Sequence, residues 1–66
     1  MNTDVIGTNA GSVWNVLNEK NAQPLKALKK ATKLKDKEIY PALGWLAREG
    51  KIAIEESEDD VIITLV

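Results

Sequence analysis

The feature that most constrains this fold is a helical pattern that ends at a glycine and is followed at once by a strand pattern. Residues 36–56 read DKEIYPALGWLAREGKIAIEE. A helix over about residues 37–49 has one apolar stripe at the i, i+4, i+7 and i+8 spacing of an amphipathic helix. The stripe consists of Ile39, Leu43, Leu46 and Ala47. Gly50 supplies the left-handed stop of the helix, and residues 52–55 then alternate with the period of a strand.

A first helix is predicted over roughly residues 4–19. Its apolar stripe consists of Ile6, Ala10, Val13, Trp14 and Leu17. Gly7 and Gly11 weaken this helix, each by about 1 kcal/mol relative to alanine. We therefore expect fraying before Asn9 or Ser12, because both residue types are good local caps.

A second helix is predicted over about residues 24–32, with Pro24 in its first turn, where the missing N–H does no harm. Its inward side carries Leu25, Leu28 and Thr32. A short turn over residues 32–35 is expected to tuck Leu34 inward. Asp36 is the expected N-cap of the third helix, because aspartate favours that position.

The chain closes with a β-ribbon. Residues 57–60 form its turn, and residues 61–66 return with two largely apolar faces, one of which is needed for the core. A third short strand near Ala22–Gln23 completes a sheet of two or three strands. Three helices followed by this ribbon predict a mainly α fold with a small sheet (α+β), a winged helix-turn-helix. The expectation is a single domain over residues 1–66.

Composition excludes several classes of function. The 66 residues contain no Cys and no His, which excludes disulfides, the commonest zinc sites and the usual bases and nucleophiles. The acidic turn SEDD lacks the spacing of a calcium loop. We therefore expect no enzyme activity, cofactor, metal or small-molecule ligand. No apolar run is long enough to cross a bilayer and no signal-peptide pattern is visible, so a soluble cytoplasmic protein is expected.

Charge is unevenly distributed, although the net charge is −1. Residues 20–37 carry seven lysines and one aspartate, whereas residues 52–66 carry five acidic residues and no basic one. Lysines on one face suit a polyanion, because they neutralise phosphates and orient a domain on DNA. The candidate nucleic-acid contacts are Lys26, Lys29, Lys30, Lys33, Lys35, Lys37 and Arg48. The alternative is a solvated face that only improves solubility.

The outer stripe of the third helix predicts poor direct readout of bases. It consists of Lys37, Pro41, Gly44 and Arg48. Proline and glycine offer no side-chain hydrogen bond to a base edge. Tyr40 and Trp45 flank the stripe, and packing or a dimer contact is favoured for them because exposed aromatics commonly mark interfaces. The acidic turn of the ribbon would repel phosphates, which argues against a DNA contact there.

Three segments carry a resemblance to a known group: NAGSVWNVLNEK at residues 9–20, LKALKKATKLKDKEIYPALGWLAREGKI at residues 25–52, and the closing ribbon. Together they resemble the small bacterial stand-alone winged helix-turn-helix proteins known as a domain of unknown function. More distantly, YPAL followed by a leucine and REG resembles the recognition helix of PadR-type repressors. The resemblance implies a winged-helix fold, a nucleic-acid role and homodimers.

Two functional hypotheses remain open at this point. The first is duplex DNA binding by a homodimer in transcriptional regulation, with second-helix lysines on phosphates and the start of the third helix in the major groove. The alternative is a homodimeric protein-interaction module without nucleic-acid binding, which the near-zero net charge and the acidic turn favour. Surplus apolar residues form the candidate dimer interface. They are Val5, Val16, Trp45, Ile62 and Val66.

Overall fold

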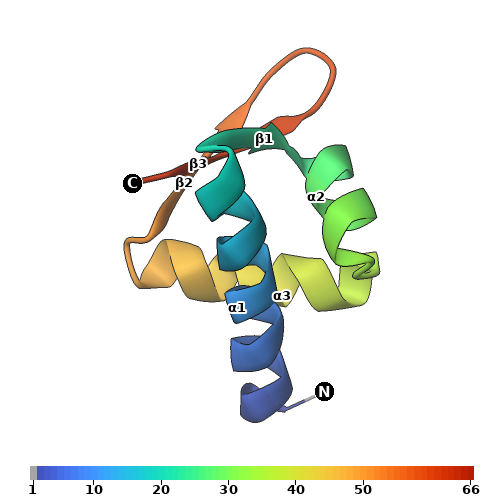
Figure 1. Cartoon of the computed structure of the whole chain (residues 1–66), viewed down its shortest axis with the longest axis vertical. Helices are drawn as coiled ribbons and strands as arrows, with labels where there is room; N and C mark the ends of the chain where they lie inside the picture. The colour runs from blue at the N-terminus through green and yellow to red at the C-terminus, as the bar shows by residue number, and fades with distance from the viewer. Residues whose placement is uncertain (1) are drawn as a thin grey trace.

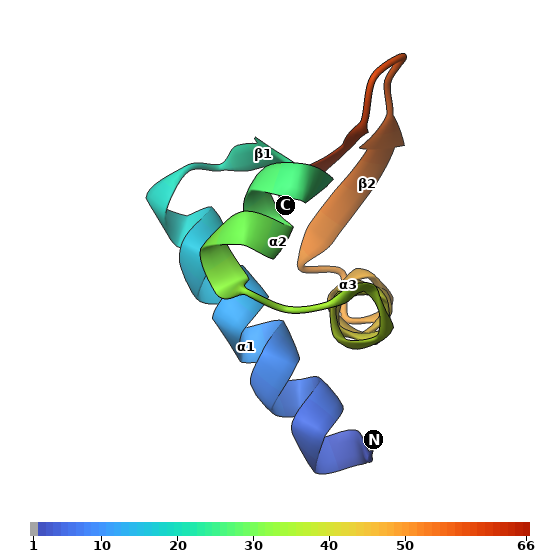
Figure 2. The same cartoon turned by 90° about the vertical axis from the view of Figure 1, so that its right-hand side faces the viewer.

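The order of helices and strands is the predicted one. The protein is described by a computed structural model covering residues 2–66 (Figures 1 and 2). Its elements are α1 (Thr3–Glu19), β1 (Ala22–Pro24), α2 (Leu25–Thr32), α3 (Asp36–Arg48), β2 (Ile52–Glu56) and β3 (Val61–Leu65). In Figure 1, α1 crosses α3 and leads into the sheet, and the β2–β3 connection projects beyond the sheet. The predicted α+β architecture is confirmed.

Helix α1 runs unbroken through both of its glycines. Asn2 caps it, because its Oδ1 accepts the backbone N–H three residues further on at 2.9 Å. The predicted fraying before Asn9 or Ser12 is therefore wrong. Packing adds to the cap: a Cβ placed on Gly7 would lie 3.7 Å from the ring of Trp45, so α3 covers this turn of α1.

The buried faces of two helices differ from the predicted stripes. Trp14 of α1 is 40% exposed and is not part of the core. In α3, Ala42 is buried and Ala47 is exposed, so the predicted inward position of Ala47 is wrong. On spacing alone, either alanine would complete the apolar stripe of α3. Which of the two is buried depends on the side of α3 against which the other elements pack.

The turn between α2 and α3 contains a left-handed residue. Lys33 has φ 61° and ψ 20°, and its N–H donates to the Lys29 carbonyl at 2.8 Å. The Thr32 hydroxyl oxygen accepts the N–H of Leu34 at 3.3 Å. Leu34 is partly buried and packs against the core, as predicted. The αL residue satisfies a carbonyl at the end of α2 and redirects the chain into α3.

Helix α3 begins one residue earlier than predicted. Lys35 is its N-cap and Asp36 is already helical, so the prediction of Asp36 as N-cap is wrong. The Glu38 carboxylate accepts the Lys35 N–H at 2.9 Å. Because Asp36 does not cap the helix, its carboxylate is free to reach another partner.

The predicted stop at Gly50 is confirmed, and it forms a Schellman motif. Gly50 has φ +73°. Its N–H donates to the Ala47 carbonyl at 3.0 Å, and the Lys51 N–H donates to the Leu46 carbonyl at 3.0 Å. These two bonds satisfy carbonyls of the last turn of α3 and aim the chain into β2.

The sheet is antiparallel with strand order β1-β3-β2, so the predicted third strand is present. Ile63 lies at its centre, opposite Gln23 of β1 and Ile54 of β2. Gln23 is the buried polar residue of this region, and its Nε2 donates to the Val16 carbonyl at 3.0 Å. That bond caps the last turn of α1, where carbonyls lack helical partners.

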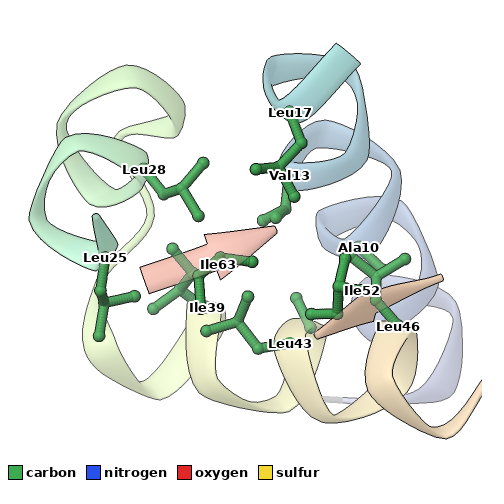
Figure 3. Packing of buried hydrophobic residues seen from close by; sticks show 11 residues of the cluster. Ala10, Val13, Leu17, Leu25, Leu28, Ile39, Leu43, Leu46, Ile52 and Ile63 are labelled. Atoms are coloured by element: carbon green, nitrogen blue, oxygen red, sulfur yellow. The ribbon is translucent and has the colours of Figure 1, made fainter. Parts of the chain in front are cut away.

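The core lies where the three helices meet the inner face of the sheet (Figure 3). It contains Ala10, Val13, Leu17, Leu25, Leu28, Ile39, Ala42, Leu43, Leu46, Ile52 and Ile63. In Figure 3 the α1 and α2 side chains converge on Ile63, with α3 below it. This packing fixes the α2–α3 pair and leaves the outer faces of both helices in solvent.

Candidate nucleic-acid interface

Six of the seven predicted contacts lie within residues 26–37, on α2, in the following turn and at the start of α3. Five of them are exposed: Lys26, Lys30, Lys33, Lys35 and Lys37. Arg48 is also exposed but lies at the other end of α3. Eleven residues of helix separate it from Lys37, a rise of about 16 Å. The structure therefore groups the six lysines and sets Arg48 apart.

One of these lysines is paired. Lys29 Nζ lies 2.8 Å from Asp36 Oδ1, the only ion pair among residues 2–66. The hydrogen bond to Asp36 is the main cause that raises the pKa of Lys29. The other lysines have no carboxylate partner within the described chain, so their charge is available to an external anion.

The exposed face of α3 differs from the predicted outer stripe. Tyr40 is 51% exposed, whereas Pro41 is partly buried. The exposed positions are Asp36, Lys37, Tyr40, Gly44, Ala47 and Arg48. Between the two cationic ends, only the Tyr40 hydroxyl can hydrogen-bond to a base edge. The i+3 spacing from Lys37 was the sequence signal that could have placed Tyr40 on this face.

The turn of the ribbon makes a contact that the sequence did not predict. We call residues 57–60 the wing turn. Asp60 Oδ2 accepts the backbone N–H of Lys26 at 3.2 Å, and its Oδ1 accepts the N–H of Val61 at 2.7 Å. The N–H of Val61 is the largest cause that lowers the pKa of Asp60, and the N–H of Lys26 is the second. No local pattern could reveal this contact, because Asp60 and Lys26 are 34 residues apart.

The wing turn is closed by bonds between its two ends. The Ser57 hydroxyl donates to the Asp60 carbonyl at 2.6 Å, and the Ser57 N–H donates to the same oxygen at 2.8 Å. The remaining acidic side chains of the ribbon are Glu55, Glu56, Glu58 and Asp59, all exposed. None forms an ion pair within residues 2–66. The negative charge of these four side chains is therefore not neutralised by ion pairs with the lysines.

The winged helix-turn-helix domain family DUF2582 matches residues 1–65 of this sequence. The chain belongs to this family. The resemblance noted from residues 9–20 and 25–52 is thereby confirmed. A search of curated proteins gives no significant match.

Solved structures share this winged-helix fold. The solution NMR structure of protein BT2368 from Bacteroides thetaiotaomicron is 35% identical, with a TM-score of 0.85 over 98% of this chain and 79% of that chain. The crystal structure of AbfR of Staphylococcus epidermidis is 27% identical, with a TM-score of 0.79 over 86% of this chain and 41% of that chain. A structure of reduced AbfR bound to DNA is 21% identical, with a TM-score of 0.79, and covers 96% of this chain and 52% of that chain. This winged-helix chain thus spans about half the length of AbfR.

The five predicted interface residues of the winged-helix domain occupy different environments. Val5 is 42% exposed and Val66 is 84% exposed. Ile62 is half-buried on the outer face of the sheet. Val16 and Trp45 are partly buried against the core, so they offer less surface to another chain. The dimer interface stays a prediction.

Two further properties bear on other kinds of site. Within residues 2–66, no three His, Cys, Asp or Glu side chains are grouped closely enough to hold a metal ion. The helices described for this winged-helix domain are too short or too polar to span a membrane.

Proposed function

We propose that this winged-helix protein binds duplex DNA and acts in transcriptional regulation. The observation that carries the proposal is the group of unpaired lysines around the α2–α3 turn. Lysines in such a group neutralise phosphates and release counterions, which supplies affinity. The shared fold with AbfR, which has been solved bound to DNA, supports the same function.

In the proposed complex, α2 lies against the phosphate backbone and the start of α3 enters the major groove. Lys30 and Lys33 contact phosphates, and Lys37 lies at the end of α3 that enters the groove. Tyr40 is the one polar side chain in the middle of the exposed face of α3. Because few side chains can read base edges, affinities for different duplex sequences should differ little.

The test is a fluorescence-anisotropy titration of a random-sequence duplex with the purified chain at increasing salt. We expect log K to fall linearly with log salt, with a slope of about −0.9 per phosphate contact. The variant Lys30→Glu with Lys37→Glu should abolish binding. Lys20→Glu with Lys51→Glu is the matched control, because it changes net charge equally outside residues 26–37 and should bind more tightly than the first pair. Absence of binding by the wild type at low salt would refute the proposal.

A homodimer is part of the proposal, formed through Val5, Val16, Trp45, Ile62 and Val66. Exposed apolar side chains support association, and they also favour the second candidate, a protein-interaction module without DNA binding. The exposed large apolar residues are Val5, Trp14, Tyr40, Ile54 and Val66. Sedimentation tests association, and a monomer at all concentrations would refute the dimer. A cytoplasmic location also follows from a DNA-binding role.

A further inference from the structure

The N-terminus of helix α2 has no side-chain cap from its own N-cap residue. Its N-cap is Pro24, which offers no side-chain acceptor to the first turn. The acceptor comes from Asp60, whose Oδ2 lies 3.2 Å from the backbone N of Lys26. The wing turn is therefore fixed to the beginning of α2 by a carboxylate.

The surroundings of this carboxylate are those that a phosphate also uses. Backbone N–H groups in the first turn of a helix, with lysine side chains beside them, bind phosphate oxygens. The charges of Lys26 and Lys29 both act on Asp60 and, after the two backbone N–H donors, lower the pKa of its carboxyl. Asp60 is thus ionised at neutral pH and occupies this position as an anion.

We propose that Asp60 is a built-in competitor of DNA phosphate at the first turn of α2. The inference rests on the proposed function and adds a regulatory contact to the same surface. While Asp60 is in place, the positive charge at this end of α2 is partly neutralised. Phosphate contacts are then confined to the other end of α2 and the start of α3, where Lys30, Lys33, Lys35 and Lys37 are exposed.

A purely structural cap makes the opposite prediction. If Asp60 only stabilised α2, its replacement would leave DNA affinity unchanged or lower it through partial unfolding. If Asp60 is a competitor, removing its charge allows a DNA phosphate to bind at the first turn of α2, and DNA affinity rises. DNA affinity therefore separates the two roles, provided that the variant still folds.

The experiment compares Asp60→Asn with Asp4→Asn by titrating the same random duplex in the full chain. Asparagine keeps an oxygen acceptor for the Lys26 N–H, and both variants change net charge equally. Asp4 is exposed in the first turn of α1, far from the sheet in Figure 1. We expect Asp60→Asn to bind about fivefold more tightly than Asp4→Asn, the factor for one pair of unit charges about 4 Å apart in water. Its salt slope should steepen by about 0.9, the value for one additional phosphate.

The outcomes separate this inference from the proposed function. Equal affinities and equal slopes for the two variants, with a wild type that binds DNA, would overturn the competitor role alone. Binding by Asp60→Asn without binding by the wild type would refute DNA binding as the function of the native chain, while still showing that Asp60 competes with phosphate. No binding by any of the three proteins would overturn the DNA-binding function and the competitor role together. Asp60→Ala, checked for folding by circular dichroism, should tighten binding in the same direction.

Discussion

Lys29 Nζ and Asp36 Oδ1 lie 2.8 Å apart across the turn that joins α2 to α3. The pair links the last turn of α2 to the first residue of α3, and it removes one lysine from the positive surface. The two side chains are 34% and 61% exposed, so solvent and salt screen the interaction. The pair therefore mainly lowers the positive charge of the proposed DNA-binding surface, and it contributes little to the stability of the fold.

Replacing Asp36 by Asn tests this assignment. The substitution frees Lys29 and removes a negative charge beside the proposed phosphate contacts, so we expect tighter DNA binding at low salt. Stability in urea should fall slightly at low salt and be unchanged in 1 M salt, where the Debye length is about 3 Å. Weaker DNA binding by a folded Asp36→Asn protein would show that the pair positions α3 for binding.

Lys33→Gly should change stability and DNA binding in opposite directions. Lys33 adopts the left-handed conformation, which strains an L-residue by about 1–2 kcal/mol and does not strain glycine. Urea unfolding should therefore show a gain of about 1 kcal/mol, whereas loss of one charge should weaken DNA binding.

Lys30→Gly is the matched control, because it removes the same charge from the interior of α2. It should destabilise the protein by about 1 kcal/mol and weaken DNA binding similarly. A loss of stability in Lys33→Gly would contradict the strain at this turn.

Two glycines at α3 should respond in opposite ways to alanine. A Cβ on Gly44 would meet nothing within 4 Å, so Gly44→Ala should stabilise the exposed middle of α3 by about 1 kcal/mol. Gly50 has φ +73°, and Gly50→Ala should destabilise the Schellman turn by about 1–2 kcal/mol. Urea denaturation of both variants measures the difference, and equal signs would contradict the assigned backbone conformations.

Ile63 of β3 and Ile54 of β2 are directly paired on neighbouring strands, yet they should differ in their contribution to stability. Ile63 is fully buried, and Ile54 is 47% exposed. Ile63→Ala should cost about 2–5 kcal/mol. A chain of 66 residues has a total stability of about 3–10 kcal/mol, so the variant should lose a large share of its stability. Ile54→Ala should remain folded by circular dichroism, and similar losses in the two variants would refute the position of the core.

Acid should remove a part of the stability that depends on Asp60. The pKa of its carboxyl is lowered in the folded state, first by the Val61 N–H and then by the Lys26 N–H. A depressed pKa stabilises the fold above the unfolded value of about 3.9. That contribution is lost as pH falls through the lower folded pKa.

Between pH 5 and 2, the wild type should therefore lose more stability than Asp60→Asn, which has no carboxyl at this position. Urea midpoints measured over that range check the difference. Parallel loss in both proteins would show that Asp60 is not bound to α2 in solution.

Local patterns were sufficient to predict the elements of this protein. The stop at Gly50, the strand after it and the stripe containing Ile39, Leu43 and Leu46 follow from backbone sterics and periodicity, which act over a few residues. The lysine-rich segment is equally a property of consecutive residues. Two errors concern α3: its cap is Lys35 where the residue preference favoured Asp36, and its inner face contains Ala42 where spacing alone admitted either Ala42 or Ala47.

The sequence by itself therefore determined the order of helices and strands and the concentration of positive charge between residues 20 and 37. Only the tertiary structure decided that Ala42 and not Ala47 is buried in α3, that Trp45 covers Gly7, and that Asp60 caps α2 from 34 residues away. The physical reason is range. Helix and strand preferences are set by neighbours along the chain, whereas exposure, ion pairing and tertiary capping depend on which surfaces packing brings together.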